Sequence, residues 1–399
     1  MTAELERQLA ERVWPERPRM TLVDMAQYWR DKNPFVMEGR VVVRRLGLFG
    51  DVDQGIPDGE CAVTTLATGP HGTVYGTTAG RRVHLFYYDT RPTGDSIADT
   101  GVIEGATEAA PTLVFLGDDT LMGAVRFYDD SLEGGYLFMR RSRGDAMHPY
   151  FIPDRPAKRL AVPVPGEGVA AIADDGTGER VIGVSTDSNT VFRYTPPFEP
   201  PRNSDEEPRE EVLEVLGRIE TDAFVTPWLA PDGSGGLWTA AGENLVRIDA
   251  ASGEASVTDI AIADAERVDR MAMDTETNRL YLGVSPGGAL AVADLAQGAV
   301  RRLGEATEAP GPIRALTVGH DGRVYGVSGP RGALGLFFEY NPEGDELRQL
   351  GTLRASQQRV WTGYEFDAAC TGPYGEIVLG ESERISHLFV YYPPVRRRG

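Results

Sequence analysis

The sequence is poor in cysteine and lysine, and it has no long apolar run. Its two cysteines, Cys61 and Cys370, cannot by themselves build a disulfide framework or a zinc site. No stretch reaches the roughly 18 consecutive apolar residues that a membrane helix needs. The charged residues Glu4, Glu6 and Arg7 interrupt any signal-peptide core. We therefore expect a cytoplasmic protein with no membrane partner.

Positive charge is also scarce. The chain has 60 acidic against 40 basic residues, which gives a formal net charge of −20, and only Lys32 and Lys158 are lysines. Bulk attraction to nucleic acid or to an anionic membrane requires the opposite balance, so we expect no nucleic-acid partner. With 41% hydrophobic and 25% charged residues, the composition is that of a soluble globular protein rather than a fibrous or disordered one.

The chain contains an internal repeat. Each copy runs from an apolar stretch through a Gly/Asp turn and a short strand to a second strand that ends in an aromatic residue and Asp or Pro. Four copies are clear: LATGPHGTVYGTTAGRRVHLFYYD from Leu66, LAPDGSGGLWTAAGENLVRID from Leu229, LTVGHDGRVYGVSGPRGALGLFFEYN from Leu316 and CTGPYGEIVLGESERISHLFVYYP from Cys370. Three degenerate copies keep the same order, which makes seven.

The spacing of the copies predicts the architecture. From the turn at Gly72 to the turn at Gly375 there are six intervals over 303 residues, so the period is about fifty residues. Four short antiparallel strands and their turns fill that length, as in one blade of a β-propeller. Because one blade cannot bury both of its faces, the repeat predicts an all-β fold in which seven blades close into a ring.

The two ends of the repeat predict how the ring closes. The last copy stops after its third strand, His387 to Tyr392, with no fourth strand left. The string GRVVVRRLG from Gly39 resembles the fourth-strand ends GAVRRLG and DELRQLG of two other copies. We expect this N-terminal strand to complete the seventh blade. Residues 39–399 then form the propeller, and residues 1–38 form a short helical extension in which Thr2 and Thr21 are candidate N-caps.

The same alignment keeps the two cysteines apart. Cys370 precedes its repeat glycine, Gly372, by two residues, whereas Cys61 precedes the matching Gly69 by eight. The offset of six residues corresponds to about 20 Å along neighbouring inner strands. That distance excludes a disulfide bridge.

Any functional site is expected on the face where the loops between the second and third strands, and between one blade and the next, gather round the channel. Several motifs fail this test. The G-x-S-x-G match from Gly283 ends a strand and feeds no helix, so it is no nucleophile elbow. His71 and His320 fall in turns on the opposite face. The acidic turn at 174–179 lacks EF-hand spacing, so we predict no metal site and assign no cofactor.

Two histidines occupy equivalent positions on the expected face. His84 and His387 immediately precede Leu-Phe at the start of the third strand in copies one and seven, which are neighbours across the closure. Two interpretations stay open. The imidazoles can pack between blades and donate to a carbonyl, or they can act as acid or base, which suits a group whose pKa lies near neutrality.

Further polar side chains are expected near the two histidines. Proton abstraction next to a carboxylate needs a base, a phenol that protonates the leaving oxygen, and a guanidinium for the carboxylate. We therefore take His84, His387 and Tyr364 as catalytic candidates. The substrate-binding candidates are Arg126, Tyr128, Trp228, Arg270, Arg314, Trp361 and Glu365. For any single arginine, a surface ion pair is the alternative.

Two families share these strings. GTTAGRRVHLFYYD and GESERISHLFVYYP resemble the seven-bladed propeller polysaccharide lyases and related rhamnosidases that act on uronate-containing glycans. APDGSGGLWTAAGENLVRID is similar to the virginiamycin B lyase-like propellers. Both resemblances cover the repeat framework over roughly residues 39–394. They imply a carbon–oxygen lyase acting on uronate-containing oligosaccharides, and the catalytic carry-over extends only to His84 and His387.

A non-catalytic propeller is the alternative. In that case residues 1–38 and the acidic loop 196–211 would dock a protein partner, and the loop face would be shallow with scattered side chains. A lyase would instead carry a deep, arginine-lined pocket for a small-molecule or oligosaccharide ligand. Fold analogy by itself does not decide between the two.

Overall fold

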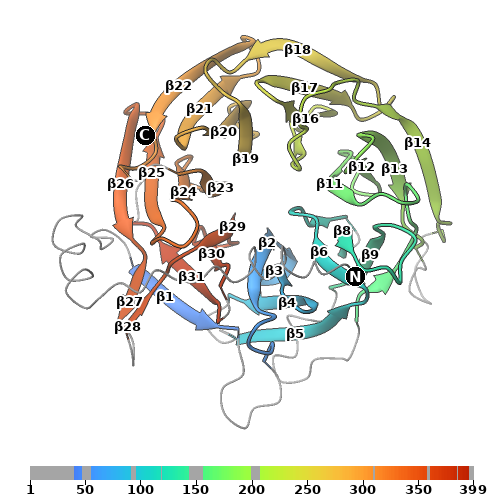
Figure 1. Cartoon of the computed structure of the whole chain (residues 1–399), viewed down its shortest axis with the longest axis horizontal. Coiled ribbons are helices and arrows are strands. Elements are labelled where there is room, and N and C mark those ends of the chain that lie inside the picture. Colours follow the sequence, from blue (N-terminus) through green and yellow to red (C-terminus); the bar gives the residue numbers. More distant parts are fainter. Residues whose placement is uncertain are drawn as a thin grey trace.

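The structure, a computed structural model, describes residues 40–46, 55–90, 96–117, 119–142, 156–198, 207–308, 311–356, 360–383 and 385–394. These residues form seven β-sheets that stand as blades around a central channel (Figure 1). The predicted all-β, seven-bladed propeller is confirmed. The helical extension predicted for residues 1–38 lies outside the described residues. No helix in the described ranges is long and apolar enough to cross a membrane.

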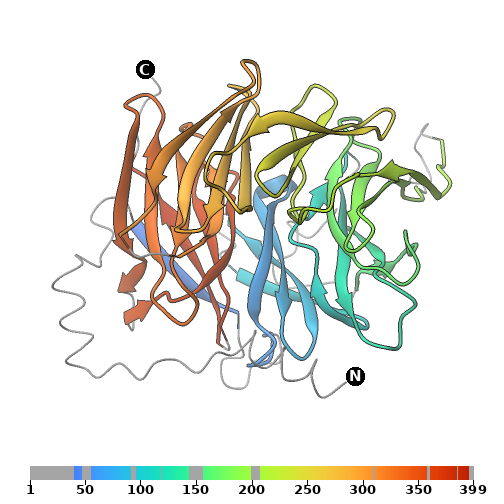
Figure 2. The ribbon, with the colours of Figure 1, turned by 45° about the horizontal axis from the view of Figure 1, so that its top comes forward.

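The first three blades are formed by residues 62–218, and their strands run between the two faces of the ring (Figure 2). Blade one is β2 (Ala62–Thr68), β3 (Thr73–Ala79), β4 (Val83–Asp89) and β5 (Ser96–Ile103), with the one-turn helix η1 (Pro70–Gly72) between β2 and β3. Blade two is β6 (Ala106–Ala109), β7 (Val114–Phe115), β8 (Thr120–Tyr128), β9 (Leu137–Arg141) and β10 (Lys158–Arg159). Blade three is β11 (Val169–Asp174), β12 (Val181–Ser185), β13 (Thr190–Thr195) and β14 (Val212–Arg218).

The remaining blades follow in chain order round the ring (Figure 1). Blade four is β15 (Ala230–Pro231), β16 (Gly236–Ala241), β17 (Asn244–Asp249) and β18 (Ala255–Ala261). Blade five is β19 (Arg267–Asp274), β20 (Arg279–Ser285), β21 (Ala289–Asp294) and β22 (Ala299–Glu305). Blade six is β23 (Ile313–Val318), β24 (Val324–Ser328), β25 (Leu336–Asn341) and β26 (Glu346–Thr352), followed by the hairpin β27 (Arg354–Ser356) and β28 (Val360–Thr362). Blade seven takes β29 (Phe366–Thr371), β30 (Ile377–Glu381) and β31 (His387–Tyr392) from the C-terminal part of the chain.

The outer strand of blade seven comes from the start of the chain. Strand β1 (Arg40–Arg45) pairs antiparallel with β31, with Val43 opposite Phe389 and Arg45 opposite His387. The prediction that the strand after Gly39 completes the last blade is therefore confirmed. The ring is closed by backbone hydrogen bonds between two segments that are more than 340 residues apart, as the pairing of Arg45 with His387 shows.

One glycine in the second strand of several blades makes room for an aromatic ring of the third strand. At Gly76 an added Cβ would lie 2.4 Å from Cζ of Phe86, which is closer than any real contact. The same close approach recurs at Gly123 with Phe138, Gly183 with Phe192 and Gly326 with Phe338. This packing explains why the repeat carries glycine and an aromatic residue at fixed positions.

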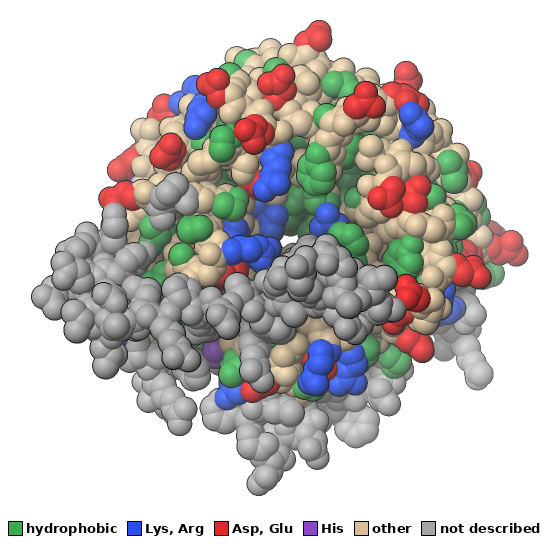
Figure 3. Space-filling model, in the orientation of Figure 1, with side chains coloured by type: hydrophobic (Ala, Val, Ile, Leu, Met, Phe, Trp, Pro, Cys, Tyr) green, Lys and Arg blue, Asp and Glu red, His purple; other side chains and the backbone are tan. Residues whose placement is uncertain are grey.

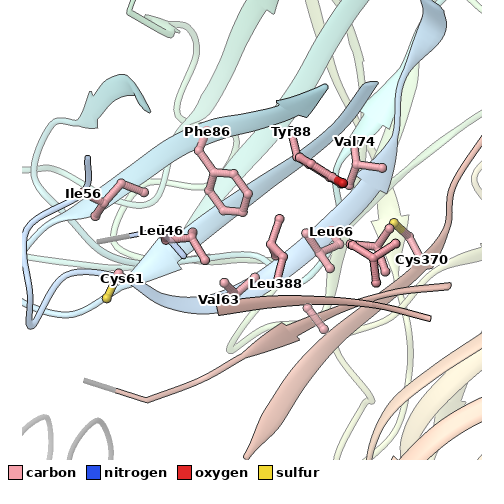
Figure 4. Packing of buried hydrophobic residues seen from close by; sticks show 13 residues of the cluster. Leu46, Ile56, Cys61, Val63, Leu66, Val74, Phe86, Tyr88, Cys370 and Leu388 are labelled. Atoms are coloured by element: carbon pink, nitrogen blue, oxygen red, sulfur yellow. The ribbon is translucent and has the colours of Figure 1, made fainter. Parts of the chain in front are cut away.

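The cores lie between neighbouring blades. The core between blades seven and one includes Val63, Phe86 and Leu388, all fully buried, and Cys61 and Cys370 belong to it (Figure 4). Both cysteines are free, as predicted. Removing the side chain of a fully buried leucine costs about 2–5 kcal/mol, because it loses apolar burial and leaves a cavity. The closure therefore depends on packing as well as on the β1–β31 ladder.

Candidate functional site at the mouth of the central channel

The first halves of the inner strands surround a cavity of about 180 Å³ in the central channel. Every blade except the third contributes to its lining. Three arginines and two carboxylates are among the lining residues, and we call these five the basic mouth: Arg126, Arg270, Arg331, Glu108 and Asp367. Trp228, Pro111, Thr64 and Ser382 complete much of the remaining wall.

Bulges in the inner strands help to place polar side chains here. The pairing of the inner strand with the second strand skips one residue in five blades. The skipped residue is Ala170 in blade three and a polar residue in blades one, five, six and seven: Thr64, Asp269, Arg314 and Asp367, respectively. A bulged residue leaves the hydrogen-bond ladder, and its side chain takes a new direction. Thr64 and Asp367 line the cavity, and Arg314 reaches Asp367.

Asp367 lies between two arginines. Arg314 donates from Nε and Nη2 to Asp367 Oδ1 over 3.0 and 2.6 Å. Nη2 of Arg270 lies 3.7 Å from the same oxygen. Burial by itself would raise the pKa of Asp367, but the charges of Arg314, Arg270 and Arg331 lower it to about 2. Asp367 is therefore ionised at neutral pH.

The guanidinium of Arg270 is fixed in place by the backbone. Its Nε donates to the carbonyl of Arg314 at 2.5 Å, and its Nη1 donates to the carbonyl of Asp269 at 2.8 Å. The guanidinium carbon also lies 5.2 Å from the centroid of the Trp228 ring, within range of a cation–π interaction. Burial lowers the pKa of Arg270 to about 10, so the group stays charged at neutral pH.

Glu365 connects this network to the loop that carries Arg331. Its Oε2 lies 3.2 Å from Arg314 Nη2, and its Oε1 accepts a hydrogen bond from the backbone nitrogen of Gly332. Glu365 and Arg314 are both buried. As a result Glu365 and Arg314 contact protein groups and position Asp367 and the Arg331 loop.

Blade two supplies the remaining charged pair of the mouth. Arg126 Nη1 lies 3.2 Å from Glu108 Oε1, and both side chains are largely buried. Basic side chains border the central opening, whereas acidic side chains are scattered over the outer part of the same face (Figure 3). The lining has three guanidinium groups and two carboxylates, so its net formal charge is +1 in a chain whose net charge is −20.

A second cavity of about 490 Å³ shares Pro111 and Trp228 with the first, and we call it the apolar cavity. The later halves of the inner strands of blades one to five line it. Its lining is Leu66, Ala67, Thr68, Pro111, Thr112, Leu113, Val114, Phe115, Ile172, Ala173, Asp174, Trp228, Leu229, Ala230, Pro231, Met271 and Met273. The channel thus changes from charged to apolar along its length.

His84 lies near the start of β4, is not among the residues that line the two cavities, and is 3% exposed. Nδ1 is 2.9 Å from Asp99 Oδ2, and Nε2 is 2.9 Å from Glu60 Oε2. Burial by itself would lower the pKa of His84, but the two carboxylates raise it. A protonated ring that donates from both nitrogens has no lone pair with which to take a substrate proton.

Glu60, the buried partner of His84, also accepts from Arg82 Nε at 2.9 Å. Burial by itself would raise the pKa of Glu60, but His84 and Arg82 lower it below its ordinary value. Glu60 precedes β2, whereas Arg82 and His84 belong to the turn and strand that follow β3. Together with Asp99 of β5, these three charged residues therefore join the segment before β2 to the third and fourth strands of blade one.

His387 begins β31 in the neighbouring blade. Its Nδ1 lies 2.7 Å from Glu381 Oε2, and both residues are buried. The other oxygen of Glu381 accepts a hydrogen bond from the backbone nitrogen of Tyr364 at 3.2 Å. The structure thus connects two of the three catalytic candidates, His387 and Tyr364, through Glu381, while His84 has its own set of carboxylates.

The remaining candidates lie elsewhere. Tyr128 ends β8 and packs against the core between blades one and two; burial and the nearby Asp187 and Glu167 raise its pKa. Trp361 belongs to β28 in the hairpin between blades six and seven, where it pairs with Ala355, and its side chain is not described. Of the ten predicted site residues, only Arg126, Trp228 and Arg270 line the cavity of the mouth.

Sequence reasoning missed Glu108, Asp367 and Arg331. Arg331 was within reach, because it lies in the loop between the second and third strands of blade six, where blade one carries Arg81 and Arg82. Asp367 and Glu108 sit inside inner strands, which alternation alone assigns to the core. No group of three or more His, Cys, Asp or Glu is placed to hold a metal ion among the residues that the structure describes.

Comparisons with known proteins identify the fold. No family model matches the chain, and no curated protein sequence matches it. Streptogramin B lyase superposes with a TM-score of 0.64 at 10% identity, over 89% of this chain and 99% of that one. The fold-level resemblance to virginiamycin B lyase-like propellers is confirmed by this match.

Propellers of other kinds are similar too. The extracellular domain of a putative one-component system from B. thetaiotaomicron gives a TM-score of 0.58 at 13% identity, over 88% of this chain and 40% of that one. The WD40 repeats of RRP9 give 0.53 at 12% identity, over 90% and 99%. At such identities the likeness establishes a shared fold and carries no activity with it.

Proposed function

We propose that this protein binds a small molecule bearing a carboxylate, which enters the basic mouth and contacts Arg126, Arg270 and Arg331. The observation that carries the proposal is the charge of the lining: three guanidinium groups and two carboxylates surround one cavity. A third carboxylate, supplied by a ligand, would balance that charge.

The geometry favours a planar anion. All three guanidinium nitrogens of Arg270 donate to backbone carbonyls, those of Arg314, Asp269 and Asp367, so the guanidinium is held in one orientation before any ligand arrives. A preorganised guanidinium loses little conformational entropy on binding, and each of its two terminal nitrogens keeps a second N–H group for a carboxylate. Because Arg126 and Arg270 are largely buried, their attraction for an anion is screened less than at the surface.

The test is calorimetric titration of the full chain with a panel of carboxylates, among them galacturonate oligomers and butanoate. We expect Arg126→Gln and Arg331→Gln each to weaken binding about 10- to 100-fold, the value of a charged hydrogen bond. Arg301→Gln is the control, because Arg301 pairs with Asp345 on the exposed outer strand of blade five. The proposal fails if no carboxylate binds, or if both mouth variants bind as the control does.

A finer proposal is lyase activity on uronate-containing oligosaccharides. It is supported by the arginines of the mouth and by Glu381, whose two oxygens hold the imidazole of His387 and the backbone nitrogen of Tyr364. In such a reaction the base removes the proton next to the carboxylate, a carbon–carbon double bond forms, the C–O bond breaks, and the phenol protonates the leaving oxygen. We choose His387 as the base because one carboxylate, Glu381, orients its ring, whereas both ring nitrogens of His84 already contact carboxylates.

The lyase proposal is tested with oligogalacturonates by following the ultraviolet absorbance of the unsaturated product. We expect His387→Gln and Tyr364→Phe each to slow its formation by at least about 100-fold, the usual contribution of acid–base catalysis. His320→Gln, in an exposed turn between β23 and β24, is the control. If the native chain forms no unsaturated product, lyase activity is excluded while carboxylate binding stands.

The alternative of a non-catalytic propeller that docks a protein stays a prediction. Its first element, residues 1–38, lies outside the described residues, and so do residues 199–206 of the acidic loop. The cytoplasmic location and the lack of nucleic-acid and membrane partners also stay predictions.

A further inference from the structure

We infer that the ligand is amphipathic: its carboxylate lies in the basic mouth and its apolar body extends past Trp228 into the apolar cavity. This inference rests on the proposed binding of a carboxylate and adds the chemical class of the ligand, whose apolar body takes the place of the sugar rings in the lyase proposal. It follows from the side chains that the two cavities share and from the apolar lining of the second cavity.

The two cavities meet at the same side chains. Trp228 and Pro111 line both of them. On β19 the lining changes from charged to apolar within one residue, because Arg270 lines the cavity of the basic mouth while the next residue, Met271, lines the apolar cavity. On β2, Thr64 lines the cavity of the basic mouth and Leu66 lines the apolar cavity. A single extended molecule can therefore contact both.

The apolar cavity offers little to polar ligand groups. Asp174 is its one charged lining residue in the described part of the chain, and the Oδ1 of Asp174 already accepts from the backbone nitrogens of Gly176 and Gly178 at 3.0 and 3.1 Å. Thr112 Oγ1 accepts from the nitrogen of Ile172, and Thr68 Oγ1 donates to the carbonyl of Thr371. Sugar hydroxyls buried here would lose their hydrogen bonds to water and gain few in return.

The same surface suits an apolar body. A lining of methionine, leucine and aromatic side chains around about 490 Å³ falls within the range of pockets that take small organic ligands. Met271 and Met273 are unbranched and polarizable, so they adapt to ligands of irregular shape. Trp228 presents its ring to both regions, next to the fixed charge of Arg270.

The experiment is a titration of the full chain with straight-chain carboxylates from butanoate to octanoate, with octanol and octylammonium as matched head-group controls. Each buried methylene contributes about 0.8 kcal/mol, so affinity should rise about four-fold per methylene. Octanol and octylammonium should bind at least about ten-fold more weakly than octanoate, because they lack the anion.

Met273→Gln should weaken the dependence of affinity on the length of the alkyl chain and leave butanoate affinity unchanged. The reason is that Met273 lines the apolar cavity and not the cavity of the basic mouth. Leu113→Gln, in blade two, is a second variant with the same expectation. Val257→Gln, on the exposed outer strand of blade four, is the control. The slope measured on the native chain decides the inference even if a variant fails to fold.

The outcomes separate the two proposals. If butanoate and octanoate bind equally, the amphipathic ligand is ruled out and carboxylate binding survives. If affinity rises with chain length but octanol binds as well as octanoate, the arginines do not select an anion and both proposals fail. If no carboxylate binds at all, both fail at the first step.

Discussion

Replacing Asp367 with asparagine should destabilise the ring and at the same time strengthen the binding of added carboxylates. The substitution keeps the shape of the side chain and removes its charge. Arg270 and Arg314 then lose the carboxylate that lies 3.7 and 2.6 Å from them. Arg314 keeps the carboxylate of Glu365, whereas Arg270 keeps backbone carbonyls, the ring of Trp228 and the charge of Asp269, with no carboxylate in an ion pair, so its buried charge is less well compensated.

Breaking a buried ion pair by removing one partner costs about 3–5 kcal/mol. Unfolding entropy of about 2.1 cal/mol/K per residue over about 300 described residues converts this to a fall in Tm of about 5–8 °C. The pKa of Asp367 is about 2 in the folded chain, against an ordinary value of 3.8. This difference contributes about 2 kcal/mol to the free energy of unfolding above pH 4, and the contribution is lost as the pH falls towards 2. The asparagine variant should lack this acid-sensitive contribution.

Scanning calorimetry at constant ionic strength, with acetate replacing chloride, measures both effects. The lining of the variant has three guanidinium groups and one carboxylate, so acetate should raise its Tm more than it raises that of the native chain. Asp345→Asn, which removes the exposed partner of Arg301, is the matched control and should shift Tm by about 1 °C or less. An Asp367→Asn protein that melts with the native chain, or gains nothing from acetate, would refute the reasoning.

Three further predictions follow from the fold and the closure. Deleting residues 1–45 removes β1 and exposes the edge of β31, so the shortened chain should melt lower and self-associate, as seen by calorimetry and light scattering. Gly76→Ala should cost about 1–3 kcal/mol in urea unfolding because its Cβ would overlap Phe86, whereas Gly217→Ala, with open space around it, should cost less than 1 kcal/mol. His84→Gln should destabilise the chain most between about pH 4.5 and 6.5, where the raised pKa of His84 contributes fully. That deficit should shrink as the pH rises through the native pKa of His84, and a deficit that grows above pH 7 would contradict the assignment.

Most of the architecture could be predicted because each copy of the sequence repeat forms one blade. The period of about fifty residues indicated one blade per copy, and the seven copies indicated the number of blades. The unpaired third strand at His387 indicated the strand after Gly39 as its partner. Closure is a long-range pairing, yet it was predictable because a ring leaves a single place for an orphan strand. The glycine and aromatic positions follow from one packing contact used in several blades.

The site was predictable only in part, for a physical reason. Arg126, Trp228 and Arg270 were found because their place in the repeat puts them at the channel. Asp367 was missed because a bulge of one residue decides its direction. The bulge recurs near the start of the inner strand in several blades, but different residue types occupy it, so no residue pattern marks it before the strands are paired. The surroundings of His84 were missed as well, because Glu60 and Asp99 come from segments that pair with it only in the folded blade.

The most direct test of the central claim is a crystal structure of the full chain grown with octanoate. We expect density for the carboxylate among Arg126, Arg270 and Arg331, with the alkyl chain running past Trp228 towards Met273. Octanoate found only outside the channel, or the channel filled by water alone at saturating octanoate, would contradict it.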